Sequence, residues 1–220
     1  MTWHGVLVFA HVLLLVYWLG TDLGVFYSAR YVLQPNLPPA TRGTIARILL
    51  ALDLSPRICL VLMLPVGMSL AASMGVSPVT GGWLAAVWIA SLVWLTLVVT
   101  LYRGEHLPAA AVLRQVDLAV RVLLVATLLG TAIASLAGAG PFATTWLPWK
   151  IIAYAIAIAC GVAIRVVLRP FGPALAALLS DGSTPEVEAA LARSLRGTYP
   201  FVLTIWAMLL IAAFLGAVQP

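Results

Sequence analysis

The stretch that decides the fold occurs twice, as Asp53-Leu54-Ser55-Pro56-Arg57-Ile58-Cys59-Leu60-Val61 and, 64 residues later, as Asp117-Leu118-Ala119-Val120-Arg121-Val122-Leu123-Leu124-Val125. Each copy begins an apolar segment that runs through an uncharged loop. A second apolar segment follows, which starts at a tryptophan and ends at an arginine. An internal repeat of this kind indicates one structural unit used twice. The sequence therefore predicts two helical hairpins in the same orientation, over residues 53–103 and 117–169.

The composition places these hairpins in a membrane. Hydrophobic residues make up 63% of the 220-residue chain and charged residues 9%, and the mean hydropathy is +1.10. A soluble domain of this length needs more polar surface. Segments of the roughly 20 apolar residues that cross a bilayer cover residues 5–29, 55–74, 82–102, 115–137, 147–168 and 199–217. We predict an all-α polytopic membrane protein, a single domain over residues 1–220 with six transmembrane helices in a lipid bilayer.

The basic residues indicate the topology. Arginines lie after the first predicted helix and at every later helix end on the same side, whereas the loops 73–82 and 138–145 carry no charge. Under the positive-inside rule, both termini lie outside a bacterial-type inner membrane, with the arginines in the cytoplasm. The net charge of +5 thus reflects topology, and nucleic acid is not an expected partner.

Two stretches lie outside the predicted spans. Residues 33–40 predict a turn that leads into a short helix over 41–52. Within 170–198, Thr184 before Pro185 has the form of an N-cap followed by proline at the first helical position. The apolar residues that follow at helical spacing favour an interfacial helix, and a plain connector is the alternative.

One face of the first helix carries the polar residues least expected in lipid. At 100° per residue, His4, His11, Trp18 and Asp22 fall within about 40° of one another, so this stripe is expected to face the interior of the bundle. An ionised aspartate at the centre of a transmembrane helix costs roughly 3 kcal/mol. Asp22 therefore needs a partner or a proton.

Two arginines are candidate partners for Asp22. Arg57 and Arg121 begin their predicted helices on the same side of the membrane, and each follows its own aspartate, Asp53 or Asp117, at the i,i+4 spacing of an intrahelical ion pair. We expect a buried charge cluster of these five residues. It would act as a clamp that fixes the packing of three helices, or as part of a proton or substrate path.

A cofactor site is suggested by depth along the helices. His11 and Met68 lie about six residues from the outer ends of their predicted helices, and Met208 lies somewhat deeper. Histidine with methionine is an axial pair for haem iron, and the same ligand types suit copper. A histidine hydrogen-bonded to a neighbour among core methionines is the alternative.

The only lysine, Lys150, lies one turn inside the outer end of the fifth predicted helix. Its ammonium group could reach the lipid headgroups, as long cationic side chains at helix ends do. Alternatively, it could face an anionic group such as a porphyrin propionate, with Tyr154 one turn deeper on the same face. No phosphate loop, dinucleotide fingerprint, zinc pattern or nucleophile elbow competes with these sites.

Several motifs resemble a known family. Ala10-His11, then Trp18, then Gly24-Val25-Phe26-Tyr27-Ser28-Ala29-Arg30 resembles the first helix of HemJ-type protoporphyrinogen oxidases and of CopD-type copper-resistance membrane proteins. Trp146-Leu147-Pro148-Trp149-Lys150 resembles the Trp-Leu-x-x-Lys motif of that superfamily. The chain departs from it by an apparent insertion at Gly20-Thr21-Asp22 and by six helices in place of four.

The HemJ-type resemblance implies haem b bound through His11, with Lys150 matching the family's lysine. The CopD-type resemblance implies copper movement instead. The leading hypothesis is a haem-b-binding membrane oxidoreductase that acts on a porphyrin or quinone, with His11, Met68 or Met208, Lys150, Tyr154 and Trp18 at the cofactor. One alternative is a carrier of copper or a small solute, in which Asp22 couples an ion. The other is a non-catalytic subunit of a membrane complex. The sequence leaves assembly open, including a homo-oligomer.

Overall fold

The computed structural model describes residues 2–104 and 108–219, and these residues form helices without strands. The helices are α1 (Trp3–Val32), α2 (Pro39–Leu52), α3 (Leu54–Ser73), α4 (Gly81–Arg103), α5 (Ala110–Leu136), α6 (Trp146–Val167), α7 (Phe171–Asp181), α8 (Pro185–Gly197) and α9 (Tyr199–Val218). Six segments are long and apolar enough to cross a membrane, and each contains one of α1, α3, α4, α5, α6 and α9. The predicted class, an all-α polytopic membrane protein with six transmembrane helices, is confirmed.

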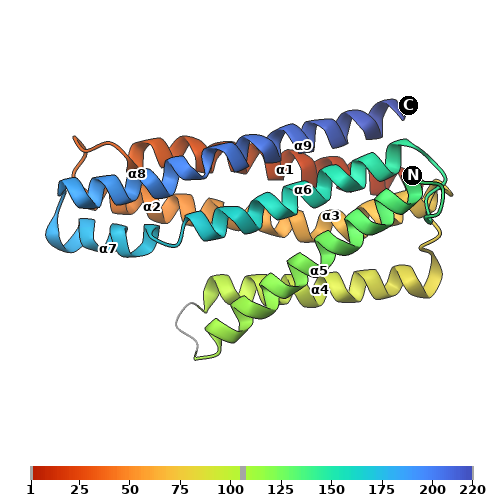
Figure 1. The fold of residues 1–220 in the computed structure, drawn as a ribbon, viewed down its shortest axis with the longest axis horizontal. Coiled ribbons are helices and arrows are strands. Elements are labelled where there is room, and N and C mark those ends of the chain that lie inside the picture. The colour runs from red at the N-terminus through yellow and green to blue at the C-terminus, as the bar shows by residue number, and fades with distance from the viewer. Residues whose placement is uncertain (1, 105–107, 220) are drawn as a thin grey trace.

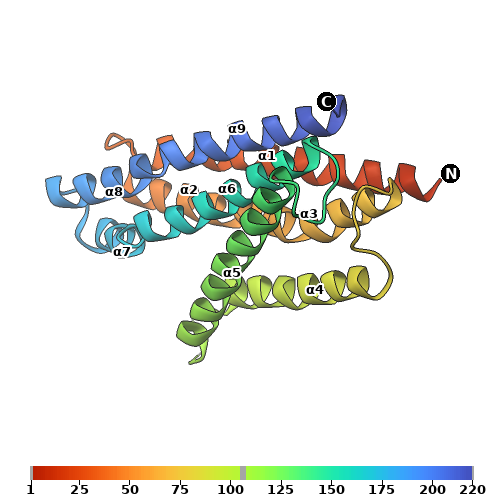
Figure 2. The same cartoon turned by 45° about the vertical axis from the view of Figure 1, so that its right-hand side comes forward.

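Four of the long helices form the main bundle. Helix α1 packs along α3 and α6 packs along α9, and these four helices run side by side in Figure 1. Helix α4 packs on α3 and α5 packs on α6, so the members of each predicted hairpin are neighbours. Figure 2 shows α4 and α5 standing off to one side of the bundle. The apolar core, which includes Trp18, Val61 and Ile158, lies between the helices of the bundle.

The two ends of the bundle differ in chemistry. Both termini lie at one end, beside the α3–α4 and α5–α6 loops, and we call this the terminal end (Figure 1). The short helices α2, α7 and α8 lie at the opposite end, which we call the arginine-rich end. The helices carry arginine there, including Arg30, Arg103 and Arg165 in the last turns of α1, α4 and α6.

The short helices form a cap on the arginine-rich end of α1. Apolar residues of α2, α7 and α8, including Leu49, Leu178 and Leu191, make a second buried core against Ala29 and Val32. The expected N-cap at residue 184 is confirmed, because the Thr184 hydroxyl accepts a hydrogen bond from the Val187 amide at 3.4 Å. Helix α7 was not expected, since residues 171–181 precede the helix predicted to begin after Thr184. Its apolar side chains are buried only because α2 and α8 cover them.

A buried arginine joins the cap together. Arg42 of α2 is fully buried, and its Nε donates to the Val32 carbonyl at the end of α1 at 2.7 Å. Its other two nitrogens donate to the two carboxylate oxygens of Glu188 in α8, at 2.6 and 2.9 Å. This bidentate pair is the strong form of an arginine–carboxylate contact, and it fixes α8 on α2.

Two helices extend further than the apolar pattern predicted. Helix α1 begins at Trp3 and ends at Val32, against the predicted 5–29, and α5 begins at Ala110, against 115. Apolar length measures the hydrocarbon crossing, whereas the hydrogen-bonded helix continues into the interface. Arg121 consequently lies 11 residues into α5, or about 16 Å along its axis, whereas Arg57 lies within the first turn of α3.

Candidate functional site

A cavity of about 390 Å³ opens between α1, α3, α6 and α9 toward the terminal end. Its walls are predominantly apolar, and the polar side chains that reach it are His4, His11, Lys150, Tyr154 and Gln219. A cavity of this size with few polar groups is typical of a site for a small molecule or cofactor, for which about 300–1,000 Å³ is usual. We call it the His11 cavity.

Sulfur atoms are concentrated at this cavity. All four methionines within the described residues line it: Met63 and Met68 from α3, Met74 from the C-cap of α3, and Met208 from α9. The sequence had singled out Met68 and Met208 by depth and had missed the other two. A signal existed, because Met63 and Met74 lie 11 residues apart and therefore on nearly the same face of α3.

His11 lies against the backbone of α3. A Cβ added at Gly67 would lie 3.3 Å from His11 Cε1 and 3.7 Å from Nδ1, so the absence of a side chain at Gly67 admits the imidazole. The Nδ1 atom of His11 is buried and has no hydrogen-bond partner among residues 2–104 and 108–219. An unsatisfied buried polar atom typically costs about 1–3 kcal/mol. Such a group in a cavity wall indicates a site that takes a ligand or a water.

His4 lies nearer the terminal end of the same cavity. It is exposed, and its Nδ1 lies 3.0 Å from the Ser73 hydroxyl at the end of α3. His4 and His11 lie seven residues apart on α1, about 10 Å along its axis, so the two histidines cannot bind one metal ion together.

Lys150 of α6 reaches the cavity beside α9. A Cβ added at Gly216 would lie 2.5 Å from its Nζ, so the ammonium group rests in the space that this glycine leaves open. No ion pair involving Lys150 occurs in the described part of the chain. A half-buried cation beside an apolar cavity favours an anionic group as its partner.

Tyr154 and Trp18 lie at the inner wall. The Tyr154 hydroxyl donates to the Leu60 carbonyl at 2.6 Å, which ties α6 to α3. Trp18, which the sequence grouped with the cofactor residues, is 3% exposed and meets the Tyr154 ring edge to face at 6.4 Å. It lines a second cavity rather than the His11 cavity. The Trp18–Tyr154 pair therefore separates the two.

The second cavity, of about 160 Å³, lies toward the arginine-rich end. Its charged lining residues are Asp22, Asp53, Arg57, Arg121 and Arg165, from α1, the α2–α3 junction, α3, α5 and α6. We call it the arginine cavity. Four members of the predicted charge cluster thus surround one space, and the fifth, Asp117, is bonded to Arg121.

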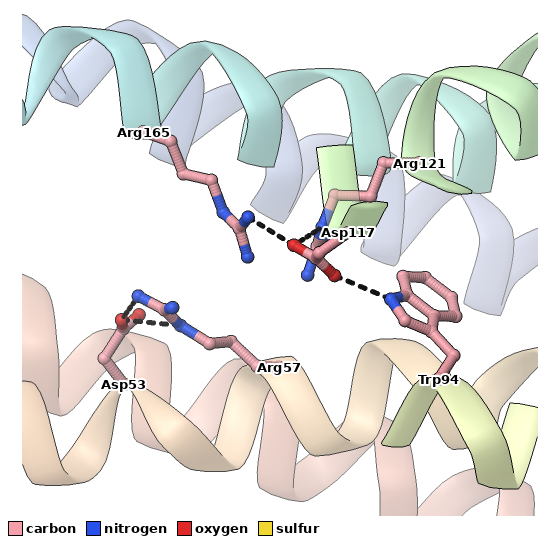
Figure 3. A network of polar contacts seen from close by, with 6 residues as sticks. All are labelled: Asp53, Arg57, Trp94, Asp117, Arg121 and Arg165. Atoms are coloured by element: carbon pink, nitrogen blue, oxygen red, sulfur yellow. Dashed lines mark hydrogen bonds and ion pairs between the residues drawn. The ribbon is translucent and has the colours of Figure 1, made fainter. Parts of the chain in front are cut away.

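Asp117 is the most heavily bonded carboxylate of this cluster (Figure 3). It is fully buried, and it accepts from Trp94 Nε1 at 2.7 Å, from Arg121 Nε at 3.1 Å and from Arg165 Nη1. The Arg121 guanidinium also lies 5.3 Å from the centre of the Trp94 ring, a cation–π distance. Sequence reasoning had missed Arg165 and Trp94, because both belong to other helices.

Asp22 has a different partner from the expected one. Its carboxylate accepts from Trp206 Nε1 of α9 at 3.0 Å, and within the described residues no salt bridge joins it to an arginine. Arg57 is instead paired with Asp53, its neighbour at i,i+4. The expected Asp22–Arg57 or Asp22–Arg121 pair is therefore corrected to a bond between α1 and α9. An indole donor can stabilise a carboxylate without a second charge.

Comparison of the chain with protein-family models, curated proteins and solved structures finds no match. Within residues 2–104 and 108–219, no three histidine, cysteine or acidic side chains gather as metal ligands. A metal in the His11 cavity would therefore depend on thioether ligands or on a prosthetic group that brings its own donors.

Proposed function

We propose that the chain is a haem-b-binding membrane redox protein and that the His11 cavity holds the cofactor. The observation that carries the proposal is the His11 imidazole, whose Nδ1 has no hydrogen-bond partner among the described residues, in an apolar cavity that thioether sulfurs and the Lys150 ammonium group also line. These three features together would suit haem b. They would offer donors for iron, apolar walls for the porphyrin and a cation for the propionates.

In this proposal His11, with Met68 or Met208, would hold the haem iron, and Lys150 would lie near the propionates. Haem iron, when bound, supplies one-electron transfer, and a porphyrin or quinone is the proposed redox partner. Tyr154, with Trp18 behind it, closes the inner wall, so the cavity is reached from the terminal end. Gly67 and Gly216 leave space beside His11 and Lys150, and any larger side chain there would narrow the cavity.

A second candidate is a Cu(I) site in a copper carrier. The observation that favours it is the presence of Met63, Met68, Met74 and Met208 around one cavity, because soft thioether ligands select Cu(I). Lys150 argues against it, since a cation beside the site would repel a second cation. A cavity of about 390 Å³ is also much larger than a single ion needs.

Titration of the detergent-purified protein with haem b tests the first proposal. We expect a saturable Soret band at one haem per chain, and His11→Ala should abolish it. His4→Ala is the matched control, because it removes the other histidine of the same cavity and should leave the band unchanged. Gly67→Val should also abolish the band, since its side chain would displace the imidazole without removing it.

Lys150→Met distinguishes the two candidates. For haem, this variant should weaken the binding affinity about tenfold, because a charge-assisted hydrogen bond is lost. The position of the Soret band should stay the same, because the ligands of the iron are unchanged. For Cu(I), measured by competition with a chromophoric chelator, it should leave affinity the same or raise it. A Soret band that is identical in wild type and His11→Ala would refute the haem proposal. A chain that binds neither haem nor Cu(I) would favour a non-catalytic subunit of a membrane complex.

A further inference from the structure

Three guanidinium groups meet at the arginine cavity and share two carboxylates. Arg57 is paired with Asp53, whereas Arg121 and Arg165 both bind Asp117. In Figure 3, Arg121 of α5 and Arg165 of α6 reach toward Asp117, whereas the Arg57 side chain of α3 turns toward Asp53. The bonded set therefore carries one more positive than negative charge.

Arg121 retains unused hydrogen-bonding capacity. The residue is 2% exposed, and its Nε is bonded to Asp117, but its Nη2 has no partner in the described part of the chain. The same side chain lines the arginine cavity. A buried guanidinium N–H without an acceptor is costly, so an anionic acceptor in the cavity would be bound favourably.

Asp22 does not supply that acceptor. It lines the same cavity, but its carboxylate is bonded to Trp206, and within the described residues it forms no ion pair with an arginine. The excess positive charge thus lies on the α3, α5 and α6 side of the cavity. The negative charge of Asp22 lies on the α1 and α9 side.

We propose that the arginine cavity binds an oxyanion, the phosphate or carboxylate group of a small molecule or of a lipid, between Arg57, Arg121 and Arg165. Its volume of about 160 Å³ accommodates such a group and is too small for a whole lipid. Apolar side chains such as Val25 and Leu49 complete the wall, so an attached apolar chain is also accommodated. The Arg57 side chain is 39% exposed and marks the accessible side.

Guanidinium groups suit this ligand chemically. Their planar N–H donors bind two oxygens of a phosphate or carboxylate at once, which an ammonium group cannot do. The site is separate from the His11 cavity, because the Trp18–Tyr154 pair lies between the two. The inference therefore does not depend on whether haem is bound.

The test uses the full chain in neutral detergent, in a chloride buffer of constant ionic strength. Inorganic phosphate and butyrate are titrated separately, and the thermal midpoint of unfolding is measured. In parallel, native mass spectrometry records lipid that stays bound after extraction from nanodiscs of phosphatidylglycerol or of phosphatidylcholine. The variants are Arg57→Gln and Arg121→Lys, which keeps the charge of the buried residue. The control is Arg169→Gln, which removes an exposed arginine at the same end.

We expect saturable stabilisation by a free anion, or retention of phosphatidylglycerol but not phosphatidylcholine. The apparent affinity for the anion, or the amount of phosphatidylglycerol retained, should fall about tenfold in Arg57→Gln and in Arg121→Lys. Both quantities should stay unchanged in Arg169→Gln. The first result identifies a free oxyanion as the ligand, and the second identifies a lipid headgroup. Absence of both effects in wild type, or equal weakening in the Arg57 and Arg169 variants, would overturn the proposal.

Discussion

Replacing Glu188 by Gln should release the cap of α2, α7 and α8 from the bundle. Glu188 accepts two charge-assisted hydrogen bonds from Arg42, which is fully buried, and one from the Ser183 hydroxyl at 2.6 Å. Breaking a buried ion pair typically costs about 3–5 kcal/mol. The Glu188 side chain is 22% exposed, and glutamine keeps one acceptor oxygen, so we expect about 2–3 kcal/mol here.

Two measurements separate the local effect from the global one. If the chain unfolds as one unit, the thermal midpoint in detergent should fall by about 5–10 °C. If the cap opens first, trypsin cleavage at Arg193 or Arg196 of α8 should accelerate about 30- to 150-fold, because each 1.4 kcal/mol changes the open population tenfold.

Glu186→Gln is the matched control for this prediction. Glu186 and Glu188 both lie in the first turn of α8, so each loses the same interaction with the helix dipole when neutralised. Glu186 is exposed, and within the described residues it forms no salt bridge. Equal behaviour of the two variants in both assays would show that the Arg42–Glu188 pair does not hold the cap.

Further outcomes follow from the charge cluster and the topology. Asp117→Asn should lower stability by about 3–5 kcal/mol, since it leaves two arginines short of their shared carboxylate, and detergent unfolding should show the loss. Asp22→Asn should cost less than about 1 kcal/mol, because the amide oxygen can still accept from the indole; an equal loss in the two variants would contradict the bonding described. If both termini lie outside, as we propose, cysteine at the exposed Ala143 should react with an impermeant thiol reagent in intact cells, whereas cysteine at the exposed Ala189 should not. Labelling at position 189 alone would show that both termini lie inside.

The membrane class could be predicted because its causes are local. A run of about 20 apolar residues suffices to fill the hydrocarbon, whatever lies beside it. The inward face of α1 was also predictable, because helical periodicity alone puts His11 and Trp18 on one stripe, and the structure has Trp18 buried and His11 at a cavity. Helix α7 was not predictable in this way, since its apolar face is buried only by contact with α2 and α8.

The partners of the polar residues could not be predicted, because they come from helices far apart in the sequence. Asp22 and Trp206 are 184 residues apart, and Asp117 and Arg165 are 48 apart. Spacing along one helix predicts i,i+4 pairs such as Asp53–Arg57, but it does not predict which residues of different helices are in contact.

The sequence by itself determined six membrane-crossing helices, their paired arrangement as hairpin candidates, and the segregation of arginine to one end of the helices. Apolar length, helical periodicity and the positions of charged residues are properties of a single segment, so they can be determined without knowledge of the rest of the structure. Only the tertiary structure decided that the methionines of residues 2–104 and 108–219 converge on His11 and that Trp18 and Tyr154 lie between two cavities. It also decided that Arg121, which lines one of these cavities, has a nitrogen without a partner in the described part of the chain. Those features depend on how helices rotate and cross against one another, and that packing is a property of the whole chain.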